Sequence, residues 1–220
     1  MIVDTQSTID LIKLRFYNEW LYNSHIYDEG ESPFHKSITE TVVRDYVLPL
    51  NLHLDSRILD LGCGPGYFMD EMKKHGYSNV TGVTLSKSDI DLCVSKGHQV
   101  KPYDLSFIPE PDESVDFIFL RHALEHSPYP IISLIEYNRL LAQNGKIYIE
   151  VPQPNCERNH EFNLNHYSIM GEKQLVALLE RTGFGVNSVI DFQFKLDTTP
   201  VVTEKYYIII ATKVAPLDIK

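Results

Sequence analysis

A glycine-rich turn between a strand pattern and a helix pattern limits most strongly how this chain can fold. Residues 57–61 are mostly branched and apolar and include one acid, Asp60. Three alternating glycines follow at positions 62, 64 and 66, and then a helical pattern begins. Such a turn at a helix N-terminus lets a ligand lie against bare backbone. In an α/β sheet this is where a nucleotide-like ligand binds.

Strand and helix patterns alternate after this turn. Strands are predicted at 57–61, 79–83, 99–103, 115–120 and 146–151, and helices at 67–75, 87–96 and 130–141. A helix at 171–182 precedes two strands, 186–195 and 205–212, whose short polar connection favours antiparallel pairing. We therefore expect a Rossmann-like, doubly wound α/β fold, with a mostly parallel sheet of seven strands and an antiparallel C-terminal hairpin.

The bulk properties fit one domain over residues 1–220, because 43% of the residues are hydrophobic and can form a sizeable core. Two N-terminal helices are predicted, at 8–22 and 34–48, the second closed by Pro49. We expect a helical cap at 1–50, a ligand-binding core at 55–152, an acceptor-side insert at 153–170, and a C-terminal helix and hairpin at 171–214.

Charge and cysteine usage narrow the partners and the compartment. The formal net charge is −10 and no dense Lys/Arg run occurs, which makes nucleic acid an unfavoured partner. The chain has three cysteines, an odd number, and none of them forms a CxxC pair. This count argues against a framework of disulfides and favours a reducing compartment. With no apolar run near ~20 residues and no signal-peptide pattern, we expect a cytoplasmic protein without a membrane span, either monomer or homodimer.

The spacing of the turn argues against a dinucleotide ligand. A dinucleotide fingerprint reads GxGxxG, whereas this chain reads GxGxG with Tyr67 in the place of the third glycine. Asp60, just before the turn, disfavours a pyrophosphate and suits an ammonium group. A nicotinamide-dependent oxidoreductase is therefore the weaker alternative.

The segment Leu59-Asp60-Leu61-Gly62-Cys63-Gly64-Pro65-Gly66 resembles motif I of class I S-adenosylmethionine (SAM) dependent methyltransferases, of the type 11 and type 23 groups. The resemblance continues at 80–86, at 104–105, at 114–126 and at 139–146, so that it covers about residues 55 to 152. It implies SAM as the cofactor and a methyl group as the transferred group.

The resemblance also implies roles for individual residues. Asp60 would hold the ammonium group of SAM, and Asp104 with the Leu105 amide would meet the adenine. Leu120 and Arg121 would line the cleft near the sulfonium. The full set of residues implied to bind the cofactor is Asp60, Gly62, Cys63, Gly64, Gly66, Thr84, Leu85, Asp104, Leu105, Leu120 and Arg121.

One position departs from the family pattern. Many members carry an acid at the end of the second strand for the ribose hydroxyls, and here that residue is Thr84. A threonine makes neutral hydrogen bonds in place of charge-assisted ones. Nearby Asp89 either compensates for the missing acid or is a solvated residue at a helix start.

Two groups of histidines follow predicted strands, where active sites of α/β folds form. His122 and His126 flank Glu125 and would share a face if this segment were helical. His160 and His166 lie in the polar insert. His126 and His166 are the candidate catalytic bases, and a structural role in loop shape is the alternative.

A metal site made by these four histidines and Glu161 is a further alternative. No HxxxH-with-carboxylate spacing lies on one confirmed helix, so the sequence predicts no metal. Farther toward the N-terminus, the aromatic residues Tyr17, Trp20, Tyr22 and Tyr27 are expected either to close over the cleft as a lid or to belong to the core.

The sequence as a whole predicts methyl transfer from SAM to a small or medium-sized metabolite, with an oxygen acceptor such as a sugar or another natural product as the first hypothesis. Two alternatives stay open. One is a non-catalytic SAM-binding or partner-binding module with a methyltransferase fold, and the other is a protein methyltransferase.

Overall fold

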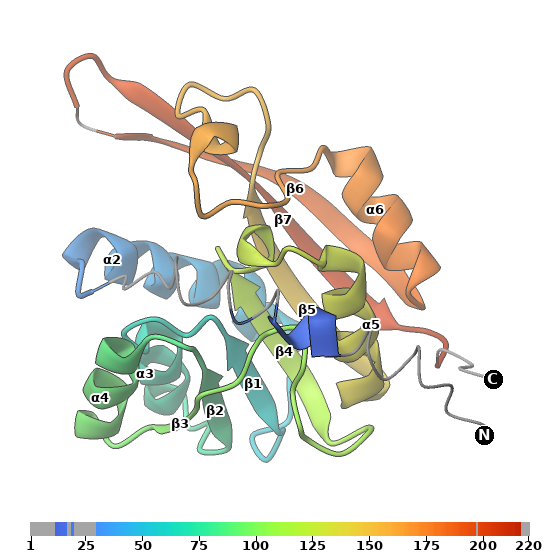
Figure 1. Cartoon of the computed structure of the whole chain (residues 1–220). Helices are drawn as coiled ribbons and strands as arrows, with labels where there is room; N and C mark the ends of the chain where they lie inside the picture. Colours follow the sequence, from blue (N-terminus) through green and yellow to red (C-terminus); the bar gives the residue numbers. More distant parts are fainter. Residues whose placement is uncertain (1–11, 17–18, 20–29, 197, 217–220) are drawn as a thin grey trace.

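Seven strands form one sheet in the order β3-β2-β1-β4-β5-β7-β6 (Figure 1). The structure is a computed structural model and describes residues 12–16, 19, 30–196 and 198–216. Strands β1 to β5 are parallel to one another, whereas β7 runs antiparallel to both β5 and β6. The predicted Rossmann-like fold, with its antiparallel C-terminal hairpin, is confirmed.

The elements begin and end within a few residues of their predicted positions, except the starts of β5 and β7. The strands are β1 (Ile58–Leu61), β2 (Val80–Val83), β3 (Gln99–Lys101), β4 (Val115–Arg121), β5 (Leu141–Pro152), β6 (Phe184–Leu196) and β7 (Val202–Lys213). The α-helices are α2 (Pro33–Val42), α3 (Tyr67–Lys74), α4 (Lys87–Ser95), α5 (Pro130–Leu140) and α6 (Glu172–Arg181). Short π- or 3₁₀-helical turns are η1 (Val43–Val47), η2 (Leu48–Leu50), η3 (Leu124–His126) and η4 (His160–Phe162).

Two N-terminal details differ from the prediction. The second predicted helix is α2 continued by the π-helical η1, and it ends where Asn51 takes a left-handed conformation. Of the first predicted helix, residues 12–16 and 19 are helical and the rest lies outside the described residues. In the part of the chain that the structure describes, no helix is long and apolar enough to cross a membrane.

Alternation along the strands divides the core between the two faces of the sheet. On β4, Phe117 and Phe119 pack with α3 and η1, and Ile118 and Leu120 pack with α5 and α6. Phe119 stacks on Phe68 of α3 with ring centroids 3.9 Å apart. Side chains alternate between faces along a strand, so apolar residues at successive positions require helices on both faces.

Helix α2 is held over α3 through its first turn. The Ser32 hydroxyl accepts a hydrogen bond from the His35 amide, and the Ser32 amide donates one to the Tyr67 hydroxyl at the start of α3. Figure 1 shows α2 beside α3 and the insert 153–170 near the carboxyl ends of β4 and β5. These two segments therefore flank the edge of the sheet at which the glycine turn lies.

Replacing Ser32 with alanine should lower the free energy of unfolding by about 1 kcal/mol, because one N-terminal amide of α2 loses its acceptor. Urea unfolding monitored by circular dichroism measures this difference. Ser37→Ala, on an exposed position inside the same helix, is the matched control and should be neutral or slightly stabilising. Equal losses in both variants would contradict the capping role.

Candidate active site

The glycine turn after β1 needs all three of its alternating glycines. Gly62, Gly64 and Gly66 have φ of 75°, 47° and 84°, a region that other residues rarely adopt. The amides of Gly62 and Cys63 both donate to the Val83 carbonyl, at 2.8 and 3.1 Å. The turn is therefore anchored to the end of β2 and lies at the carboxyl edge of the sheet.

Gly62 also brings this turn against the segment that follows β4. A Cβ atom on Gly62 would lie 2.6 Å from the Cβ of Ala123, so only glycine permits this approach. Ala123 lies between His122 and His126 in the chain. The contact places the histidine segment directly beside the glycine turn.

Hydrogen bonds from helix α4 and the residue that follows it hold the glycine turn in place. The Cys93 thiol donates to the Gly64 carbonyl at 3.3 Å, and the Lys96 ammonium donates to the Pro65 carbonyl at 2.8 Å. Lys96 also lies 5.2 Å from the centre of the Tyr67 ring. Tyr67, in the place of a third glycine, thus connects α3 to α2 and α4.

The acid before the turn and the residues after β2 lie at the carboxyl edge of the sheet, and their roles toward a cofactor stay predictions. Asp60 is 3% exposed, and it faces the α3 side because its neighbours Leu59 and Leu61 face α5 and α6. The Thr84 hydroxyl accepts from the Ser86 amide at 3.2 Å. Asp89 is 3% exposed, so the expectation of a solvated residue at a helix start is wrong for it.

The remaining predicted cofactor residues divide into edge and core positions. Asp104 Oδ1 accepts from the Ser106 amide at 2.8 Å, which fixes the turn after β3. Leu85 and Leu105 are half-buried, and Leu120 is fully buried in the core. A hydrogen bond with Cys93 and burial raise the pKa of the Cys63 thiol, so this buried cysteine stays protonated.

Arg121, at the end of β4, belongs to a buried ionic network that the sequence did not predict. Its Nε donates to Glu150 Oε1 at 3.0 Å, and the Glu150 carboxylate also accepts from His122 at 2.8 Å and Tyr148 at 2.6 Å. Burial alone would raise the pKa of Glu150, but Arg121, His122 and Tyr148 together lower it to about 2. The only signal of this network in the sequence was an acid, Glu150, inside the apolar run of β5.

The segment 122–126 does not form the helix that would place both histidines on one face. His122 has a φ of 52°, and only Leu124–His126 forms a 3₁₀ turn. His122 turns to Glu150, whereas His126 Nδ1 lies 2.8 Å from the Asn165 carbonyl oxygen. The two histidines therefore have different partners.

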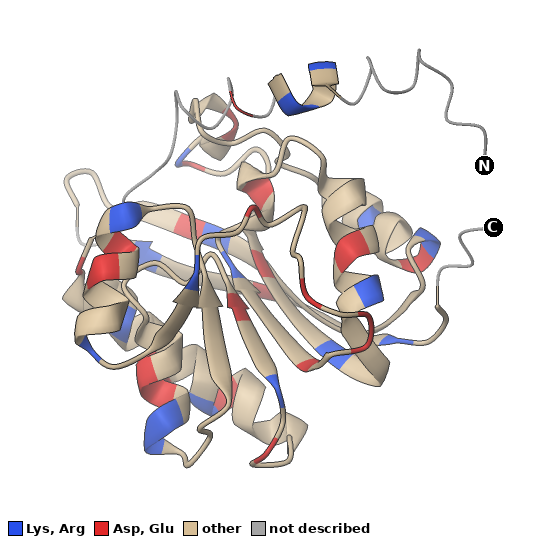
Figure 2. Cartoon of the chain, turned by 60° about the horizontal axis from the view of Figure 1, so that its bottom comes forward, with Lys and Arg blue, Asp and Glu red and all other residues tan. Residues whose placement is uncertain are grey.

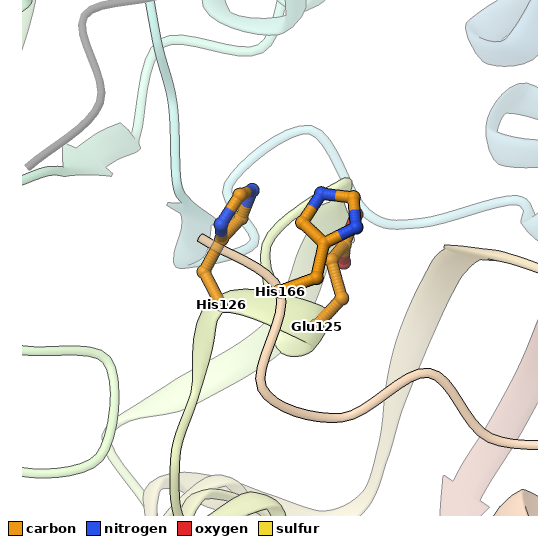
Figure 3. A group of neighbouring side chains, drawn as sticks. All are labelled: Glu125, His126 and His166. Atoms are coloured by element: carbon orange, nitrogen blue, oxygen red, sulfur yellow. The ribbon is translucent and has the colours of Figure 1, made fainter. Parts of the chain in front are cut away.

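The ring of His126 contacts the ring of His166, which belongs to the insert, and not that of His122. The two rings lie 4.9 Å apart, and the ligand atoms of His126, His166 and Glu125 all lie within 4.8 Å of one another (Figure 3). His166 Nδ1 lies 2.9 Å from the His160 carbonyl oxygen. Burial and the neighbouring His126 lower the pKa of His166 to about 4, so its ring is neutral near pH 7.

His160 and Glu161 have other partners. His160 Nε2 lies 2.9 Å from Glu204, whose carboxylate also accepts from Tyr206 and pairs with Arg158. Glu161 accepts from the Asn155 amide. The carboxylate that joins the histidines is Glu125, and Glu161, which the sequence suggested, holds the shape of the insert.

The predicted aromatic lid residues Tyr17, Trp20, Tyr22 and Tyr27 lie outside the described residues. In the view of Figure 2, Lys and Arg are interspersed with Asp and Glu, without a continuous basic stripe. This distribution agrees with the net charge of −10. Nucleic-acid binding surfaces usually concentrate Lys and Arg on one face.

Comparison with known proteins identifies the family. The model of a methyltransferase domain family matches residues 36–189. Ubiquinone biosynthesis O-methyltransferase of Coxiella burnetii is 28% identical over 130 residues, which are 56% of this chain and 53% of that protein. EEF1A lysine methyltransferase 2 of Mus musculus is 38% identical over 68 residues, 31% of this chain and 28% of that protein. The chain thus spans about half the length of the first relative and less of the second.

Solved structures agree on the fold. A SAM dependent methyltransferase from Archaeoglobus fulgidus superimposes with a TM-score of 0.67 and 21% identity, over 90% of this chain and 100% of that chain. The strand order 3-2-1-4-5-7-6 is that of the class I methyltransferase fold. The chain belongs to the methyltransferase domain family.

Proposed function

We propose that this chain transfers the methyl group of SAM to a hydroxyl oxygen of a small or medium-sized metabolite. The observation that carries the proposal is the contact between Gly62 and Ala123, which brings the glycine turn beside His126. His126 meets His166 from the insert at this point. A cofactor turn and polar groups able to act on an acceptor therefore adjoin at one edge of the sheet.

The residues present fit SAM at the glycine turn. A Cβ atom on Gly62 or Gly66 would lie within 3 Å of a neighbouring side chain, so both positions require glycine and the turn keeps this backbone conformation. We assign Asp60 to the ammonium group, Thr84 and Leu85 to the ribose, and Asp104 with Leu105 to the adenine. SAM supplies the activated methyl group when bound.

The acceptor side is assigned to α2 and the insert 153–170. The insert is attached to η3, because the Tyr167 amide donates to the Glu125 carbonyl at 2.7 Å and the Ser168 hydroxyl donates to the Leu124 carbonyl at 3.1 Å. Phe162 and Leu164 of the insert are both 83% exposed. These two side chains offer apolar contacts to an acceptor that approaches the histidines.

The similarity to the Coxiella protein, which is named an O-methyltransferase, supports an oxygen acceptor. A protein lysine acceptor is the second candidate, because the short match to EEF1A lysine methyltransferase 2 has the higher identity. The free, buried cysteines Cys63, Cys93 and Cys156 favour a reducing compartment such as the cytoplasm.

Mass spectrometry of the products tests the acceptor. The purified chain is incubated with SAM and either a panel of hydroxylated small metabolites, including sugars and phenols, or a lysine-rich protein mixture. A gain of one methyl group on a hydroxyl of a small molecule supports the proposal. Methylation confined to protein lysines would favour the lysine acceptor. The absence of any methylated product in both incubations would contradict both candidate functions.

Thr84→Val should weaken SAM binding by roughly tenfold, because a hydroxyl that bonds both the Ser86 amide and the ribose is worth about 1 to 1.5 kcal/mol. Calorimetric titration with SAM and S-adenosylhomocysteine measures the change. Thr84→Ser keeps the hydroxyl and is the matched control, with near wild-type affinity expected. Equal affinities for all three proteins would remove Thr84 from the ribose site.

A further inference from the structure

We propose that Glu125, His126 and His166 together bind a divalent transition-metal ion, and that this ion binds the acceptor oxygen. The ligand atoms of the three side chains lie within 4.8 Å of one another (Figure 3). Two ligands bonded at about 2.1 Å to a tetrahedral ion are about 3.4 Å apart. Small side-chain rotations are therefore enough to bring the three atoms around one ion.

Both imidazole rings are oriented as metal ligands usually are. His126 Nδ1 lies 2.8 Å from the Asn165 carbonyl oxygen, and His166 Nδ1 lies 2.9 Å from the His160 carbonyl oxygen. A carbonyl oxygen only accepts, so each Nδ1 carries the hydrogen and each Nε2 carries the lone pair. Metal-binding histidines commonly donate their second ring N–H in this way, which fixes the tautomer and raises the basicity of the ligating nitrogen.

The carboxylate and its support are also in place. Glu125 is 1% exposed, and its backbone carbonyl accepts from the amides of Tyr167 and Ser168, at 2.7 and 3.2 Å. The His166 ligand is thereby attached to the same turn that carries Glu125 and His126. His122 Nδ1 also lies 4.0 Å from Glu125 Oε1 and faces the same carboxylate.

Ligand chemistry selects the kind of ion. Two imidazoles and one carboxylate suit Zn²⁺, Fe²⁺, Co²⁺ or Mn²⁺, whereas Mg²⁺ and Ca²⁺ prefer sites made of oxygen ligands. Three protein ligands leave coordination positions open for another molecule. Asn163 Nδ2, which lies 3.2 Å from His166 Nε2, has to release that nitrogen when the ion binds.

The ion has a defined role in the proposed reaction, and this role rests on the proposed function. An oxygen bound to a divalent cation loses its proton more easily. The acceptor O–H bond breaks and its proton passes to solvent, while an oxygen lone pair forms the new bond to the methyl carbon. The S–CH₃ electron pair stays on sulfur, which leaves as neutral S-adenosylhomocysteine.

Titration of the chelator-treated, full-length protein with Co²⁺ and Zn²⁺ tests the site without SAM or acceptor. We expect one Co²⁺ ion per chain, with visible absorption and a calorimetric signal. His166→Ala and Glu125→Gln should each lower the affinity more than about 100-fold, beyond the effect of losing an outer hydrogen bond. His53→Ala, at an exposed histidine whose side chain is 81% accessible, is the matched control.

Two outcomes would overturn the site. One is the absence of stoichiometric Co²⁺ or Zn²⁺ binding to the wild-type chain, and the other is wild-type affinity in both ligand variants. Glu125→Gln is nearly isosteric, and an unchanged SAM affinity shows that the variant is folded. Ion binding through these residues without methylation of any hydroxyl would support the site and contradict the proposed function.

A second comparison separates a metal role from that of a simple base. Methyl transfer to a hydroxyl acceptor is measured with the metal-free protein, and Zn²⁺, Co²⁺ or Mn²⁺ is then added back. Recovery of activity with one of these ions in the wild-type chain, and its loss in Glu125→Gln, supports the proposal. Full activity of the metal-free protein would contradict the catalytic part of the proposal.

Discussion

Gly64→Arg should remove measurable SAM binding while the fold survives. Gly64 is buried at the centre of the turn with a φ of 47°, and its carbonyl accepts from the Cys93 thiol. A residue with a side chain adds about 1 to 3 kcal/mol of strain at such a φ, and the arginine would fill the backbone path assigned to the ligand. A loss of more than about 100-fold, equivalent to ~2.7 kcal/mol, is expected by calorimetry.

Gly171→Arg provides the matched control for this variant. Gly171 has an ordinary φ of −73°, and nothing lies within 4 Å of the position that its Cβ would take. This control should bind SAM as the wild-type chain does. Retained SAM affinity in Gly64→Arg, with circular dichroism showing a folded protein, would place the cofactor elsewhere.

Glu150→Ala should lower the free energy of unfolding by about 3 to 5 kcal/mol. The Glu150 side chain is fully buried and is hydrogen-bonded to Arg121, His122 and Tyr148. The Arg121 side chain is only 11% exposed, so its charge would remain buried without its carboxylate. Urea unfolding near neutral pH measures the loss.

The pH dependence of stability gives the same residue a second test. Glu150 has a pKa of about 2 in the folded protein, below its usual 4.5, so its ionised form stabilises the fold. This contribution is fully present above about pH 4.5 and is lost as the pH falls toward about 2. The contribution of ionised Glu150 to the free energy of unfolding is on the order of 3 kcal/mol. The stability difference between the wild-type chain and Glu150→Ala should therefore narrow in this window.

Asp116→Asn is the matched control. Asp116 lies near the start of β4, whereas Arg121, the partner of Glu150, is the last residue of this strand. Asp116 pairs with Arg57 at 2.8 Å, but its side chain is 35% exposed, so its removal should cost less than about 1 kcal/mol. Similar losses for Asp116→Asn and Glu150→Ala would show that burial of the network has little effect on stability. A Glu150→Ala stability curve parallel to that of the wild type in acid would contradict the assigned pKa.

Most of the fold was predictable from the sequence because its signals are local. The apolar run of β4 predicted a central strand, and the glycines at 62, 64 and 66 predicted a turn between β1 and α3. The short polar connection near residue 200 predicted the antiparallel hairpin. Each of these features follows from conformational preferences within a few consecutive residues.

The roles of side chains in the cofactor site were predicted through the family resemblance, and they stay predictions. The burial of Asp89 was not foreseen, because its position at the start of α4 is typical of a solvated acid. The pairing of Glu150 with Arg121 was also missed, since it depends on the register between β4 and β5. Sequence patterns indicate whether a position is buried, but they do not indicate which side chain it contacts.

The sequence by itself therefore determined the sheet, the glycine turn and the family of this protein. Only the tertiary structure decided which polar residues act together. Glu125 and His126 join His166, which is 40 positions farther along the chain than His126. His122 pairs with Glu150 through Nε2, and its Nδ1 lies 4.0 Å from Glu125. The physical reason is that a turn conformation at His122 and the attachment of the insert to η3 set these directions. Both depend on contacts between segments far apart in the sequence, which local patterns do not encode.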